Sequence, residues 1–217
     1  EEDIALSNMG LDLIGQARLF YTLAGEVEGQ GRDEDRLAYF RDAPEFRNVL
    51  LVELPNGDFA RTMARHLVYA SFAHPFMSAL AGSNEARLAE IAAKAEKELA
   101  YHVRHASEWV IRLGDGTDES RGRMIAGLEF VWGYGAELET MDALERELAL
   151  AGVAVDRAPI SARWTATIAG VLAEAGLEWP KDRFPQSGGR SGRHTEHLGH
   201  LLAVMQSTAR ADPEAIW

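Results

Sequence analysis

Apolar side chains recur at intervals of three and four residues along most of the chain, and this helical periodicity constrains the fold more than any other feature. Long periodic segments cover 3–27, 58–81, 85–113 and 119–150, and shorter ones cover 33–42, 159–175 and 194–211. No segment has the alternating pattern of a β-strand. Long helices joined by short connections predict an all-α protein built as an antiparallel helical bundle.

Local signals indicate where these helices begin and bend. Asp58 and Asn84 precede the second and third long segments and are predicted to cap them. Pro75 lies inside the second segment and predicts a kink. We expect a single domain over 1–217, with a bundle core at about 3–113 and a C-terminal helical extension at about 117–217.

Composition excludes several classes of protein. The 217 residues carry a net charge of −12, and such an acidic chain is a poor binder of nucleic acid. The sequence has no cysteine, which excludes disulfides, thiolate nucleophiles and cysteine metal sites. No apolar run in the sequence is long enough to span a membrane, and no secretory signal is expected. A cytoplasmic location is the expectation.

A bundle of this kind can hold a carboxylate-bridged di-iron site, which uses Glu-x-x-His pairs on two helices. The best candidate histidine is His102, which lies on the apolar stripe of its helix. The position three residues before it is Leu99, and Glu98 is rotated off the stripe. Leucine cannot bridge metal ions, so a hydrogen-bonded core histidine is the favoured interpretation.

Two acidic residues on other helices are also candidates for burial. Asp12 lies among apolar residues; Gly15, at the i+3 position, has no ligand atom, whereas Gln16 is placed to form a hydrogen bond. Glu137 lies on an apolar stripe and would need a partner, either a cation or a histidine. We expect Asp12 and His102 to belong to a polar cluster in the centre of the bundle.

Three histidines near the C-terminus have a spacing that resembles a metal-binding face. His194, His197 and His200 follow one another at i, i+3 and i+6. Because each step turns the side chain by about 60° around the helix, only neighbouring pairs converge. Hydrogen bonding at the start of the helix, or a contact with another protein chain, is the favoured interpretation.

The stretch 179–193 is predicted to be a loop rich in glycine and in cations. Lys181, Arg183, Arg190 and Arg193 all lie within it. In an acidic chain, such a concentration of cations beside exposed backbone amides is suited to an anion. An ordinary solvated loop remains the alternative.

Some apolar residues lie off the main stripes of their helices. Val68, Phe72 and Phe76 do so in the second long helix, and Phe130 and Trp132 in the fourth. A helix that is apolar on most sides must be covered on most sides, so these residues predict a large, partly apolar interface with another protein.

Four segments together resemble a known family. They are Gly10–Arg18, Leu51–Ala60, Glu98–His102 and His194–Gly199. Their sequences are similar to those of the C-type subunit of phenylacetyl-CoA epoxidase, a bacterial multicomponent monooxygenase of aerobic phenylacetate breakdown. The resemblance extends in order from about Asp3 to the C-terminus.

The resemblance implies a ferritin-like bundle in which the metal site of the related, catalytic A-type subunit has been lost. The positions of the former ligands would be Asp12, Gly15, Ala70, Leu99 and His102. The resemblance also implies a further bundle helix before Asp3. This chain would then hold no cofactor, and the di-iron centre would belong to the catalytic subunit.

The implied role is that of a structural subunit, itself without catalytic activity, in an NADPH- and O2-dependent epoxidase. Its partners would be the catalytic subunit, the small B-type subunit, and the reductase of the complex. Two alternatives stay open at this point: an active di-iron oxidase, and an unrelated helical interaction protein.

Overall fold

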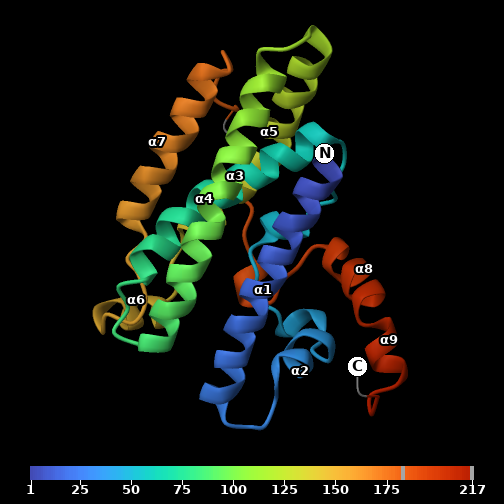
Figure 1. Ribbon diagram of the computed structural model, residues 1–217, viewed down its shortest axis with the longest axis vertical. Coiled ribbons are helices and arrows are strands. Elements are labelled where there is room, and N and C mark those ends of the chain that lie inside the picture. The colour runs from blue at the N-terminus through green and yellow to red at the C-terminus, as the bar shows by residue number, and fades with distance from the viewer. Residues whose placement is uncertain (182–183, 216–217) are drawn as a thin grey trace. The chain divides into compact units, whose positions relative to one another are not determined.

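The computed structural model describes residues 1–181 and 184–215, and every regular element in those residues is a helix (Figure 1). The all-α prediction is therefore confirmed. The chain divides into two compact units: unit 1 comprises 1–55 and 187–217, and unit 2 comprises 56–186. The elements are α1 (Glu2–Glu28), α2 (Glu34–Tyr39), η1 (Ala43–Glu45), η2 (Leu50–Glu53), α3 (Phe59–Leu80), α4 (Ala86–Gly114), α5 (Asp118–Glu139), α6 (Ala143–Leu150), α7 (Ala158–Glu174), η3 (Gly189–Ser191), α8 (Glu196–Met205) and α9 (Ser207–Ala211).

Unit 1 combines the two ends of the chain. α1 packs on α2, and α8 packs on the short helix η1. Phe46, Leu198 and Leu202 form a small buried apolar cluster there. The buried amide of Gln206 donates to the carbonyls of Ala38 and Arg41, at 3.0 and 2.9 Å. These contacts hold the C-terminal helices of unit 1 against the end of α2 and the segment that follows it.

Unit 2 is formed around α3, which contacts α4, α5 and α7 (Figure 1). α7 covers α3 with the buried indole of Trp164, whose Nε1 donates to the carbonyl of Val68 at 3.0 Å. The ring of Trp164 also meets Phe72 edge-on, with centroids 6.0 Å apart. The core of this unit therefore lies along both sides of α3.

The packing of α7 on α3 corrects the prediction that another protein covers the off-stripe apolar residues of α3. Val68 and Phe72 were expected to need another protein to cover them, but both are buried within unit 2. Phe76 and Trp132 are half-buried, and the Trp132 ring stacks on Trp164 at 5.9 Å. The sequence argument failed because it counted stripes helix by helix and did not anticipate that α7 would cover this face.

Two long helices predicted from periodicity are each interrupted. The segment 119–150 ends as α5 at Glu139 and restarts as α6, where Asp142 and Glu145 form a capping box. The segment 194–211 divides at Gln206 into α8 and α9. Apolar spacing continued across both breaks, so periodicity alone could not locate them.

The predicted caps were right in one of two cases. Asp58 accepts a hydrogen bond from the Arg61 amide and caps α3. α4 is capped by Glu85, not by Asn84, whose amide nitrogens are directed to carbonyls at the end of α6. Pro75 lies inside α3, and the kink there stays a prediction.

The expectation of one domain over 1–217 also stays a prediction, because the two compact units are described separately. In the described part of the chain, no helix combines the length and the apolar character needed to cross a membrane.

Candidate functional site

Three of the predicted ligand positions lie on the helical hairpin of α3 and α4. The side chains of Ala70, Leu99 and His102 are all 0 % exposed. The prediction that His102 points into the core is confirmed. Glu98 lies on the other side of α4 and pairs with Lys94 at 3.8 Å, as its rotated position predicted. Two apolar side chains and one imidazole therefore occupy this part of the core.

Sequence reasoning missed two further histidines in this region. The ring of His66, on α3, lies 5.1 Å from that of His102, and His105 follows one turn later on α4 and is buried. Burial, followed by the neighbouring imidazoles of His102 and His105, lowers the pKa of His66 to about 3. His66 is therefore neutral near pH 7. Its position four residues before Ala70, on the same stripe, was a signal that could have identified it.

This histidine cluster of His66, His102 and His105 is not arranged as a metal site. Within residues 1–181 and 184–215, no three histidine, aspartate or glutamate side chains are placed to share a metal ion. Di-iron centres need carboxylate oxygens as well as imidazoles, and two of the predicted ligand positions here carry the buried apolar residues Ala70 and Leu99.

The two remaining predicted positions lie on α1, in unit 1. Asp12 and Gly15 are half-buried, whereas Gln16 is buried. Because α1 and α4 belong to different units, the predicted polar cluster of Asp12 with His102 stays a prediction. Glu137, on α5, is buried as predicted, and the identity of its partner also stays a prediction.

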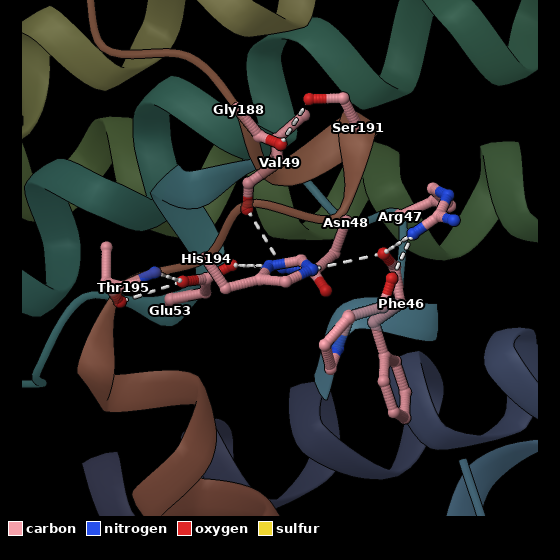
Figure 2. A network of polar contacts seen from close by, with 10 residues as sticks. Phe46, Arg47, Asn48, Val49, Glu53, Gly188, Ser191, His194 and Thr195 are labelled. Atoms are coloured by element: carbon pink, nitrogen blue, oxygen red, sulfur yellow. Dashed lines mark hydrogen bonds and ion pairs between the residues drawn. The ribbon is translucent and has the colours of Figure 1, made fainter. Parts of the chain in front are cut away.

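A second buried polar site lies in unit 1, around Glu53 (Figure 2). Oε1 of Glu53 lies 2.6 Å from Nδ1 of His194 and accepts from the Asn48 side chain at 2.9 Å. Its Oε2 accepts from both the amide and the hydroxyl of Thr195, at 2.8 and 2.7 Å. Each carboxylate oxygen of Glu53 therefore has two hydrogen-bonding neighbours.

The neighbours of the two ring nitrogens of His194 show where its hydrogens lie. Nε2 of His194 lies 3.1 Å from the Phe46 carbonyl, which can only accept, so Nε2 carries a hydrogen. Nδ1 faces the carboxylate, so a proton lies between His194 and Glu53. With both nitrogens engaged in this way, His194 has no free lone pair for a metal ion. The favoured interpretation, hydrogen bonding at the start of the helix, is confirmed for His194, while His197 is half-buried and His200 is exposed.

The cations predicted in the loop have different surroundings. Lys181 is exposed and belongs to unit 2, and Arg183 lies outside the described residues. Arg190 is half-buried, and Arg193 is exposed, both in unit 1. The structure adds an exposed residue that sequence reasoning missed, Arg47, whose Nη1 donates to the Phe46 carbonyl at 2.8 Å.

Comparison with known proteins gives a single consistent result. The chain matches the phenylacetic acid catabolic protein family over residues 1–217. It is 43 % identical over 217 residues to the C subunit of 1,2-phenylacetyl-CoA epoxidase from Escherichia coli (strain K12), a match that covers 100 % of this chain and 87 % of that protein. An unrelated helical interaction protein is thereby excluded. The chain belongs to the phenylacetic acid catabolic protein family.

Proposed function

We propose that this chain is the C-type subunit of a phenylacetyl-CoA epoxidase and that it acts as the non-catalytic structural partner of the di-iron catalytic subunit. The full-length similarity to the Escherichia coli protein supports the assignment to that complex. The small subunit of the complex, together with its reductase, completes the set of partners that we propose, and the cytoplasm is the proposed location.

The main support for a non-catalytic role is that two apolar side chains, Ala70 and Leu99, are buried at predicted ligand positions. Both stand where the resemblance to the catalytic subunit implies carboxylate ligands, and neither has an atom that can bind iron. The imidazoles of His66 and His102 lie together beside them. Imidazoles without carboxylates do not make the oxygen-rich environment that a bridged di-iron centre uses.

Exposed apolar side chains on α1 support pairing with another protein. Ile4, Leu11 and Ile14 are 67, 66 and 67 % exposed. Their spacing of seven and three residues places them on one side of the helix. Aligned apolar side chains exposed on a helix are typical of surfaces that another protein covers. These residues replace Val68 and Phe72 as the support for the predicted interface.

The test is expression of the chain with and without the catalytic subunit, followed by gel filtration, iron analysis and an epoxidation assay. We expect a stable complex, iron in the complex but not in the chain alone, and higher yield and stability of the catalytic subunit when both are present. A chain that alone retains two irons would instead support the alternative of an active di-iron oxidase. A chain that ignores the catalytic subunit would contradict the structural role.

A further inference from the structure

Two arginines from distant segments lie against the same tight turn in unit 1. The turn runs from Gly188 to Arg193 and is closed by the Arg193 amide, which donates to the Gly188 carbonyl at 2.9 Å. A Cβ at Gly188 would stand 3.6 Å from Nε of Arg193, and a Cβ at Gly192 would stand 2.6 Å from Nη1 of Arg47. The two side chains therefore pass over the first and the last glycine of one turn.

Glycine is required at both places by the backbone as well as by the arginines. The φ angles of Gly188 and Gly192 are 142° and 80°, which L side chains rarely adopt. A Cβ at Gly192 would also lie 2.5 Å from the Pro44 carbonyl oxygen. The turn consequently keeps Arg193 against its first glycine and Arg47 against its last, and a side chain at either glycine would be strained.

Both arginines are exposed, and neither has a carboxylate within ion-pair distance in the described part of the chain. Arg47 directs one nitrogen, Nη1, at backbone carbonyls, and Figure 2 shows the rest of its guanidinium turned away from them. Arg193 makes no side-chain hydrogen bond among the described residues. Other arginines of unit 1 differ: Arg18 and Arg210 each pair with a carboxylate, at 3.0 and 2.9 Å.

We propose that Arg47 and Arg193 form a contact for a phosphate group, and that the phosphate belongs to the coenzyme A portion of the thioester substrate. Two guanidinium groups from separate segments match the several oxygens and the negative charge of a phosphate. In coenzyme A, the phosphates lie at the opposite end of the molecule from the acyl group. A chain without catalytic residues could therefore hold that end while the catalytic subunit holds the acyl group.

This proposal rests on the proposed function, because the thioester is the substrate of the complex. It also revises the anion site predicted from the sequence. Arg193 stays in the site and Arg47 joins it, whereas Lys181 belongs to the other unit and the half-buried Arg190 is not needed. The revision follows from the fold, because residues 47 and 193 become neighbours only when the two ends of unit 1 pack together.

The experiment compares the Arg47→Ala plus Arg193→Ala variant with the wild-type complex. The measured quantities are the Kd for coenzyme A, by calorimetry, and the KM for phenylacetyl-CoA. We expect coenzyme A binding to weaken by about tenfold for each arginine removed, as for the loss of a charge-assisted hydrogen bond. The thioester of pantetheine, which has no phosphate, should be processed equally well by both complexes.

Two controls separate phosphate binding from other effects. Arg104→Ala plus Arg163→Ala removes the same charge from exposed positions in unit 2 and should leave the Kd unchanged. Arg193→Ala alone disturbs no hydrogen bond of its side chain in the described residues, so it should fold normally and still bind coenzyme A more weakly.

An unchanged Kd for coenzyme A in the double variant would overturn the proposal. Weaker assembly with the catalytic subunit, with coenzyme A affinity unchanged, would also overturn it, by showing that the arginines meet carboxylates of a protein. If the wild-type chain forms no complex at all, the proposed function fails instead. Titration of the chain alone with coenzyme A then still tests the arginine site.

Discussion

Glu53 and His194 are 141 positions apart in the sequence, yet Oε1 of one lies 2.6 Å from Nδ1 of the other. Their side chains are 0 and 5 % exposed. The same carboxylate accepts from both the amide and the hydroxyl of Thr195, the N-cap residue that directly precedes α8. One buried glutamate from η2 therefore anchors the residue that precedes α8.

Replacement of Glu53 by alanine should destabilise unit 1 strongly. The change would leave the His194 imidazole, the Thr195 amide and the Asn48 side chain buried without their acceptor. Breaking a buried, charged hydrogen-bond network of this kind costs about 3–5 kcal/mol. Urea unfolding followed by circular dichroism measures the loss.

The control for Glu53 is Glu139→Ala, which removes an exposed glutamate and should change the free energy of unfolding by less than about 0.5 kcal/mol. Equal stability of the two variants would show that the buried network contributes nothing. Glu53→Gln should lie between them, because an amide keeps one acceptor oxygen but places an NH2 group opposite a donor.

His66 should make the protein sensitive to acid. Burial keeps the pKa of His66 at about 3 in the folded chain, below its ordinary value of 6.5. Between these two values the unfolded chain binds a proton that the folded chain does not. Stability should therefore fall as the pH falls from 6.5 towards 3, by up to about 1.4 kcal/mol per pH unit from this residue alone.

The measurement for His66 is the free energy of unfolding at several pH values for the wild type and for His66→Gln. The variant should lose less stability on acidification, even if it is less stable at pH 7. His200→Gln, which changes an exposed histidine of α8, should keep the slope of the wild type. Identical slopes in all three proteins would contradict the role of His66.

Trp164 should contribute more to the stability of unit 2 than any exposed aromatic residue. Its buried ring contacts Phe72 and Trp132, and its Nε1 donates to the Val68 carbonyl. Trp164→Ala should cost about 3–5 kcal/mol through the cavity and the lost hydrogen bond. The matched control is Trp179→Ala, because Trp179 is 45 % exposed and should cost much less. Similar losses in thermal unfolding would refute this account of how α7 covers α3.

Local sequence patterns were sufficient to predict where most of the helices lie, but not where the long helical segments are interrupted. Periodicity located α1, α3, α4 and α7, and in α3, α4 and α7 the apolar stripe is buried along the helix. It joined α5 to α6, although the Asp142–Glu145 capping pair was visible in the sequence. A capping box is a local hydrogen-bonding preference, and an uninterrupted apolar pattern concealed it.

The buried sites depended on tertiary contacts that local patterns do not contain. The burial of His102 followed from its stripe, because the rest of its helix fixed which side faces inward. His66 could have been found in the same way. The partnership of Glu53 with His194, and that of Arg47 with the turn at Gly192, join segments separated by more than a hundred residues. No spacing rule connects such positions before the fold is known.

Restoring an acid at the lost ligand position should not restore a metal site. Leu99→Glu creates a Glu-x-x-His pair with His102, but Leu99 is fully buried and Ala70 still provides no ligand on α3. The new carboxylate would lack a partner, and the variant should lose about 3 kcal/mol or more of stability. The control Leu99→Met keeps an apolar side chain of similar volume and should cost less than about 1.5 kcal/mol.

Urea unfolding and iron analysis of both variants, expressed with iron in the medium, measure these effects. The prediction is wrong if Leu99→Glu binds stoichiometric iron and is about as stable as Leu99→Met. That result would show that the histidine cluster lacks only one ligand, although Ala70 and Leu99 together indicate that two are missing.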